Sequence, residues 1–195
     1  MLEALYEFGD VAVRYLAGPV DVRPEEHEYV MHAAAEVVDE EPPLFKDDPD
    51  KLRTLSAVLA VAYREGGLRA KVVGDCTLSK PGEPCKGRPR SFCTMQIHAS
   101  IGGNDALNDD IKTCFRTGLR ILRQSMKFCG ERAPVAWYAI GGEAEKACTN
   151  ARGLRISTDR MALAGRIYTR GRSGHNGQKG KMSPLPATLV AKEAP

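Results

Sequence analysis

The sequence predicts a mainly α-helical protein with one small region of strand and loop. Apolar residues recur at intervals of three and four along several stretches, and Pro, Asp and Ser stand where such stretches begin. The hydrophobic share of 43% is typical of a globular protein, while the aromatic share of 6% is low and favours an aliphatic, helical core. A chain of 195 residues can bury such a core, so we expect one domain with extensions.

Residues 1–43 are predicted to form an N-terminal helical extension. Its two helices are expected over residues 1–16 and 24–38, and Pro24 suits the first turn of the second helix. An apolar stripe at helical spacing follows this proline. The acidic and proline-rich residues 40–43 then break the helix and mark a junction.

Residues 44–169 are predicted to form the main domain. Its clearest helix follows Asp48 and Asp50, either of which can cap it. The buried stripe of this helix consists of Leu52, Leu55, Leu59 and Ala62. Glu65 lies on a neighbouring edge of the stripe, at the border of the core, and Gly66-Gly67 ends the helix.

Three further helices are expected after a polar loop over residues 76–90. Asp109 or Asp110 can cap the first of them, residues 133–140 form the second, and Ser157 can cap the last. Any sheet should be small and should lie within residues 70–100.

Residues 170–195 are predicted to be a flexible tail, because they are rich in Gly, Lys, Ser and Pro. The basic residues at its start are Arg170, Arg172, Lys179 and Lys181. Such a tail can hold a protein near an anionic polymer such as a bacterial wall, and a solvated end without a role is the alternative. The net charge of +3 is too small to imply nucleic-acid binding, and no apolar run is long enough for membrane insertion.

All six cysteines lie between residues 76 and 148, and their clustering in one domain fits disulfides formed in an oxidising compartment. Six cysteines can pair in fifteen ways, and the sequence alone does not choose among them. We predict the pairs Cys76–Cys85, which closes the polar loop, Cys93–Cys114 and Cys129–Cys148. Buried free thiols in a cytosolic protein are the alternative. No C-x-x-C pair is present, so we expect no zinc or other metal, and we expect no cofactor.

The cysteines predict an extracytoplasmic protein, whether periplasmic, secreted or virion-associated. The first residues are acidic and lack the basic and apolar regions of a signal peptide, so no signal peptide is visible in this chain. Export by another route, for instance inside a phage particle, would reconcile the two observations.

Three short segments follow one another along the main domain. The first is Tyr-Arg-Glu-Gly-Gly around Glu65, the second is Ser-Phe-Cys-Thr-Met-Gln over residues 91–96, and the third is Ala-Trp-Tyr-Ala-Ile-Gly around Tyr138. In order and spacing they resemble the Glu-Ser, Gly-Leu-Met-Gln and Ala-Tyr-Asn-x-Gly signatures of the lysozyme-like lytic transglycosylases, a superfamily that includes the goose-type lysozymes. The resemblance covers residues 50–168 and implies a lysozyme-like helical domain, with residues 76–90 as an insertion.

The resemblance also implies that the protein cleaves the β-1,4 bond between N-acetylmuramic acid and N-acetylglucosamine in peptidoglycan, with Glu65 as catalytic acid. A carboxyl at the border of an apolar core suits this role, since partial burial disfavours the charged form. The expected substrate-binding residues are Ser91, Met95, Gln96 and Tyr138. Methionine offers an adaptable apolar face, and glutamine offers amide groups to N-acetyl and hydroxyl substituents.

Most hydrolytic glycosidases need a second carboxylate. The acids considered for this role are Asp75, Asp105, Asp109 and Asp110. None lies where the resemblance places a functional acid, and His98 stands where goose-type lysozymes have an aspartate. A single acid implies a lytic transglycosylase, in which the same glutamate takes the proton from the C6 hydroxyl and an anhydro-muramyl product forms. A hydrolytic muramidase is the alternative.

Several positions depart from the family pattern. Gly66 replaces the serine after the glutamate, Ala139 replaces the asparagine, and Met161 stands where the family has a tyrosine, in the segment Thr-Asp-Arg-Met. These departures favour a second class of function, a non-catalytic glycan-binding or structural lysozyme-like module. The expected partners are peptidoglycan glycan strands and, in a particle or envelope, other virion or cell-envelope proteins.

Overall fold

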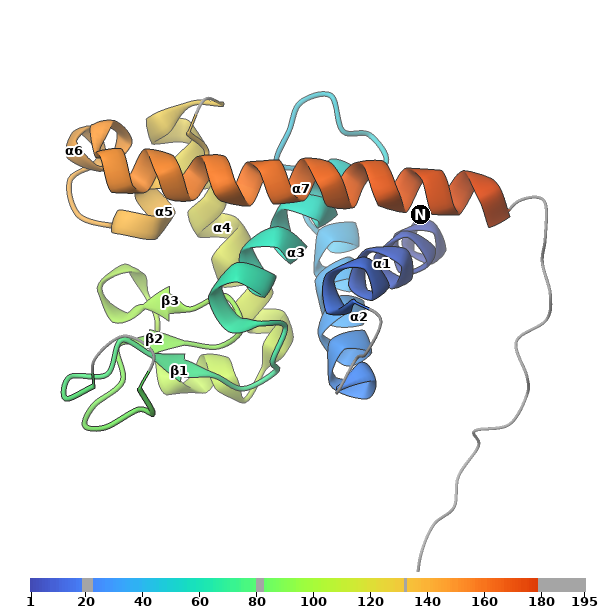
Figure 1. The fold of residues 1–195 in the computed structure, drawn as a ribbon. Coiled ribbons are helices and arrows are strands. Elements are labelled where there is room, and N and C mark those ends of the chain that lie inside the picture. Colours follow the sequence, from blue (N-terminus) through green and yellow to red (C-terminus); the bar gives the residue numbers. More distant parts are fainter. Residues whose placement is uncertain (19–22, 80–82, 132, 179–195) are drawn as a thin grey trace, which may run out of the picture.

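The computed structural model describes residues 1–18, 23–79, 83–131 and 133–178, and within them the protein is mainly helical with a small three-stranded sheet (Figure 1). The predicted mainly α fold class is therefore confirmed. The longer helices are α1 (Leu2–Ala17), α2 (Pro24–Glu40), α3 (Leu52–Gly66), α4 (Ile111–Cys129) and α7 (Ala151–Gln178). The short ones are α5 (Ala136–Ile140), α6 (Ala144–Thr149) and the 3-10 helices η1 (Ala99–Ile101) and η2 (Asp105–Asn108).

Helix α3 is the centre of the fold, since it is buried along most of its length. Asp48 caps its N-terminus: Oδ1 accepts a hydrogen bond from the backbone N of Arg53 at 3.0 Å, and Oδ2 accepts one from the backbone N of Thr54 at 2.7 Å. Asp50, the other predicted cap, accepts a longer bond of 3.3 Å from the first turn. Gly67, with a φ of 62°, ends the helix in the left-handed conformation, which costs glycine little.

Helix α7 crosses α3 and extends from α5 and α6 at one end to α1 at the other (Figure 1). At its start, the side chain of Asn150 accepts hydrogen bonds from the backbone N of Arg152 at 2.9 Å and of Gly153 at 3.2 Å. The prediction that Ser157 caps a last helix is wrong. Ser157 lies buried inside α7, where its Oγ accepts a hydrogen bond from the backbone N of Val135 at 3.0 Å.

Across the predicted boundaries at residues 43 and 169, the described residues on either side pack against one another. Leu5 and Phe8 of α1 are fully buried in the same cluster as Leu55 of α3. Helix α7 continues beyond the second boundary and packs on α1 so closely that a Cβ on Gly171 would lie 2.2 Å from the Phe8 ring. The apolar face of α1 therefore completes the core. Residues 179–195, the rest of the predicted tail, lie outside the described residues.

The sheet lies within the predicted range and is antiparallel, in the order β1 (Val73–Gly74), β2 (Ser91–Phe92) and β3 (Ile97–His98). Val73 is opposite Phe92, and Ser91 is opposite His98. The polar loop joins β1 to β2, and a tight turn with Met95 joins β2 to β3. Of the two predicted caps for the next helix, it is the Asp110 side chain that accepts hydrogen bonds from the first turn of α4.

All three predicted disulfides are present. Cys76–Cys85 closes the polar loop, Cys93–Cys114 joins the β2–β3 turn to α4, and Cys129–Cys148 joins the end of α4 to α6. The alternative of free thiols is therefore excluded for this fold. Among the described residues, no helix has the length and hydropathy needed to cross a membrane.

Loss of Cys93–Cys114 is expected to destabilise the protein more than loss of Cys76–Cys85. The first bond closes a separation of 21 residues and the second one of 9, and the chain-entropy model gives about 3 kcal/mol for a loop of roughly twenty residues. Each pair is replaced by alanine, and the free energy of unfolding is measured with urea. A larger loss from the Cys76–Cys85 pair would contradict this prediction.

Candidate active site

A pocket of about 670 Å³ opens where the end of α3, the sheet, α5 and α7 meet. Four of the five predicted site residues line it: Glu65, Ser91, Gln96 and Tyr138. They come from separate elements, because α3 contributes the acid, the hairpin β2–β3 the serine and glutamine, and α5 the tyrosine. The fold therefore brings the three segments of the predicted site into one cavity.

Glu65 lies in the last turn of α3, and its side chain is 23% exposed. Its Oε1 accepts hydrogen bonds from Nη2 of Arg160 at 3.0 Å and from Nε of Arg160 at 3.3 Å. No described residue contributes a hydrogen bond to Oε2. One carboxyl oxygen is thus held by the protein, while the other is available to a bound molecule.

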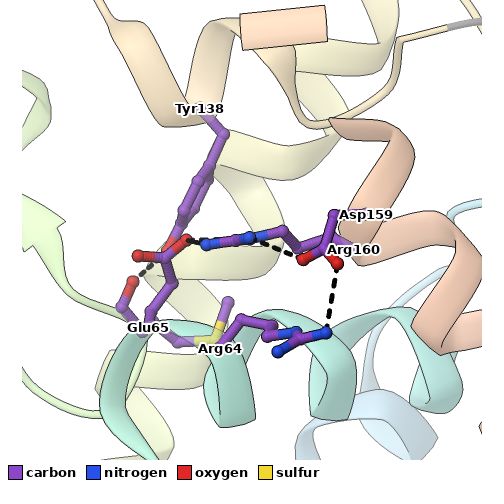
Figure 2. A network of polar contacts seen from close by, with 6 residues as sticks. Arg64, Glu65, Tyr138, Asp159 and Arg160 are labelled. Atoms are coloured by element: carbon purple, nitrogen blue, oxygen red, sulfur yellow. Dashed lines mark hydrogen bonds and ion pairs between the residues drawn. The ribbon is translucent and has the colours of Figure 1, made fainter. Parts of the chain in front are cut away.

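Arg160 forms a second ion pair with Asp159, and Asp159 in turn pairs with Arg64 (Figure 2). Its Nη1 contacts Oδ2 of Asp159 at 2.8 Å, and Oδ1 of Asp159 accepts a hydrogen bond from Nη2 of Arg64 at 3.1 Å. Arg64 and Glu65 are neighbours in α3, and Asp159 and Arg160 are neighbours in α7. The four alternating charges therefore form a chain that begins and ends in the last turn of α3.

Arg160 was not predicted from the sequence as a site residue. Its neighbour Met161 stands where the resembled pattern has a tyrosine, and it packs partly buried against the core. A signal for Arg160 was nonetheless present. It shares a helical face with Leu163, Ala164 and Ile167, all of which are buried, so a charge stands on an otherwise apolar stripe and requires a partner.

Gln96 is held in the pocket wall by its own amide. Its Nε2 donates hydrogen bonds to the carbonyl oxygens of Cys93 at 3.0 Å and Val72 at 3.4 Å, which fixes the orientation of the side chain. A Cβ on Gly74 would lie 2.1 Å from Oε1 of Gln96, so only glycine leaves room for the amide there. The glutamine is therefore prearranged rather than freely rotating.

Met95, which was predicted as a substrate-binding residue, does not line the pocket. Its side chain is fully buried, and a Cβ on Gly118 of α4 would lie 2.6 Å from its Cε. The turn points this side chain into the core because α4 offers a site without a side chain of its own. The backbone oxygen of Met95 serves the site indirectly, since it accepts the hydrogen bond from the Tyr138 hydroxyl.

Tyr138 extends from α5 toward Glu65, and its hydroxyl end points toward the Glu65 carboxylate (Figure 2). Burial raises the pKa of Tyr138 well above its usual value of 10.0, the negative charge of Glu65 raises it further, and Arg160 opposes the shift. The phenol therefore stays protonated at neutral pH. It is a donor beside the acid and not a base.

Asp75 is the only one of the four other acids considered that lines the pocket, and its Oδ2 accepts a hydrogen bond from the Ser91 hydroxyl at 2.5 Å. The remaining three, in η2 and at the start of α4, are Asp105, Asp109 and Asp110. His98 also lines the pocket, with Nδ1 accepting a hydrogen bond from the backbone N of Ser100 at 3.2 Å.

Gly66, which stands where the resembled signature has a serine, is explained by packing. A Cβ at this position would lie 2.4 Å from the carbonyl oxygen of Thr94, so the end of α3 and the β2–β3 turn touch backbone to backbone. A serine has no room at this contact. The glycine therefore reflects the close approach of the hairpin, and it is not evidence against the prediction made for Glu65.

Comparison with protein-family models, with curated proteins and with solved structures finds no match for this chain. In the described part of the chain, no group of three or more His, Cys, Asp or Glu side chains is arranged to hold a metal ion.

Gly66→Ala is expected to destabilise the protein, because the added Cβ forces the turn at Thr94 to move, and overpacking of this kind costs about 1–3 kcal/mol. The matched control is Gly165→Ala, an exposed position of α7 where nothing lies within 4 Å of the new Cβ. That control should be neutral or stabilising, since alanine favours a helix by up to about 1 kcal/mol. Thermal unfolding of both variants decides, and a Gly66→Ala protein as stable as the control would show that the contact is loose.

Proposed function

We propose that this protein is a lysozyme-like lytic transglycosylase that cleaves the β-1,4 bond between N-acetylmuramic acid and N-acetylglucosamine in peptidoglycan. The observation that carries the proposal is the meeting of Glu65, Ser91, Gln96 and Tyr138 in one pocket. These residues come from the three segments that resemble the family. If the three short segments resembled the family only by chance, there would be no reason for their matched residues to line the same pocket.

The pocket suits a glycan in size and chemistry. Its volume of about 670 Å³ lies in the usual range for small-ligand sites. Its lining offers hydroxyl, amide and imidazole groups, from Ser79, Ser91, Ser100, Gln96 and His98. Such groups form hydrogen bonds with sugar hydroxyl and N-acetyl substituents.

In the proposed first step, the proton on Oε2 of Glu65 moves to the glycosidic oxygen as the bond from that oxygen to C1 of the muramyl sugar breaks. The electron pair of this bond leaves with the oxygen, so positive charge develops at C1. The Glu65 carboxylate that remains is stabilised by Arg160, whose Nη2 is 3.0 Å from Oε1.

In the proposed second step, the carboxylate takes the proton of the C6 hydroxyl, and O6 donates an electron pair to C1. The 1,6-anhydro ring closes, the Glu65 carboxyl is protonated again, and no water is consumed. Attack from within the same sugar avoids the entropy loss of a bimolecular reaction. Tyr138 does not compete as a base, because its raised pKa keeps the phenol protonated.

The three disulfides support an extracytoplasmic setting for this activity, where such bonds persist. The proposed partners are peptidoglycan strands, met in the periplasm, outside the cell or from a virion.

Glu65→Gln is expected to abolish cleavage of peptidoglycan, because general acid–base catalysis contributes about 10²–10⁴-fold and one group serves both steps. Zymography on bacterial walls compares this variant with the wild type and with Glu145→Gln, an exposed acid of α6 that should have no effect. Binding of the variants to isolated glycan strands is measured in parallel and should be unchanged. If all three proteins bind glycan strands and none of them cleaves peptidoglycan, the result would instead support a non-catalytic module.

A hydrolytic muramidase is the second candidate, and the position of Asp75 in the same pocket favours it. Under the transglycosylase proposal, Asp75→Asn should cost far less activity than Glu65→Gln, and mass spectrometry should find anhydro-muramyl ends on the products. Reducing muramyl ends together with an inactive Asp75→Asn protein would establish water as the nucleophile.

A further inference from the structure

We infer that Arg160 is a positioning residue, which holds Oε1 of Glu65 and so presents Oε2, the oxygen that carries the transferred proton, to the bound glycan. The inference rests on the proposed function and adds a role that the resemblance does not imply. It starts from the ion pair between α3 and α7, in which both Nε and Nη2 of Arg160 contact one oxygen of Glu65.

Hydrogen-bond chemistry identifies the proton-bearing oxygen. A guanidinium group has N–H donors and no acceptor, so the oxygen that it contacts must accept. Oε1 accepts two bonds from Arg160, at 3.0 and 3.3 Å. A proton on the Glu65 carboxyl therefore resides on Oε2, which no described residue engages.

The guanidinium is well placed to fix this geometry because it is itself immobilised. The side chain of Arg160 is only 16% exposed, and its third nitrogen, Nη1, is 2.8 Å from Asp159. Asp159 is in turn held at 3.1 Å by Arg64, the residue before Glu65. Every nitrogen of the Arg160 side chain thus has a carboxylate partner, and rotation of the carboxyl would break two bonds at once.

The positive charge of Arg160 also assists the proposed reaction between the two proton transfers. A cation at hydrogen-bond distance stabilises the carboxylate, which is the form of Glu65 after it has protonated the leaving oxygen. The opposite role would be inhibitory: the ion pair would keep Glu65 ionised in the resting protein, and removal of Arg160 would raise activity. Kinetics of Arg160 variants separate the two roles.

The test measures kcat and KM of Arg160→Ala and Arg160→Lys on soluble glycan strands, with and without added guanidinium ion. We expect Arg160→Ala to lose about 100-fold in kcat, the size of effect seen when a reacting group is misplaced by about 1 Å, with little change in KM. Guanidinium ion should restore part of the lost kcat, because it can occupy the space of the missing side chain. The kcat of Arg160→Lys should lie between those of Arg160→Ala and the wild type, since lysine keeps the positive charge and loses the planar pair of N–H donors.

Two further variants keep the inference falsifiable. Asp159→Asn leaves Arg160 in place and removes its anchor, so kcat should fall less than in Arg160→Ala. Arg155→Ala, an exposed arginine of α7 that does not line the pocket, should match the wild type. Wild-type or higher kcat in Arg160→Ala would overturn the inference, and so would a loss that guanidinium ion and lysine both leave unrepaired. A wild-type protein that forms no product would instead refute the proposed function, and the inference with it.

Discussion

The packing of α7 across α3 is the constraint on which the candidate site depends. Helix α3 is buried along most of its length, so its last turn, with Arg64 and Glu65, has little freedom to move. The apolar face of α7 covers α3 and brings Asp159 and Arg160 to that turn. The resulting chain of ion pairs is only partly shielded from water, and single pairs of this kind contribute modestly to stability. The core sets the geometry, and the charges then orient one carboxyl.

A second constraint attaches the hairpin to the helices. At two points the contact is possible only because a side chain is missing: Gly66 lies against the backbone of Thr94, and Gly118 lies against Met95. The Cys93–Cys114 disulfide joins the same turn to α4 by a covalent bond. The position of Ser91 and Gln96 relative to Glu65 therefore follows from two glycines and one disulfide, none of which lines the pocket.

Charge is divided between the walls of the pocket. Helix α7 contributes Arg152 and Arg160, whereas the loop that follows β1 contributes Asp75 and Glu83. The rest of the lining includes the Glu65 carboxyl and neutral hydrogen-bonding side chains such as Ser91 and Gln96. Under the proposed function, the chemical outcome would depend on whether a water molecule or the sugar's own hydroxyl attacks the reacting carbon. The two proposed mechanisms would therefore use different walls: hydrolysis would activate a water at Asp75, and both mechanisms would protonate the leaving oxygen at Glu65 beside Arg160.

The sequence by itself determined the features with local physical causes. The mainly α class and the extent of α3 followed from apolar spacing, from the Asp48 cap and from Gly67. The predicted cysteine pairs are the observed ones, although the sequence alone did not choose among the fifteen pairings. Glu65, Ser91, Gln96 and Tyr138 were identified from short segments and do share a pocket. Other features were decided only by the tertiary structure. Helix α7 runs through Ser157 and on beyond residue 169, although that stretch is rich in glycine, because Gly171 packs against Phe8 of α1. The burial of Met95 and the contact of Arg160 with Glu65 were also decided by the tertiary structure. The direction of each side chain depends on which faces of the helices pack together, and the spacing of residues along the chain does not specify that packing.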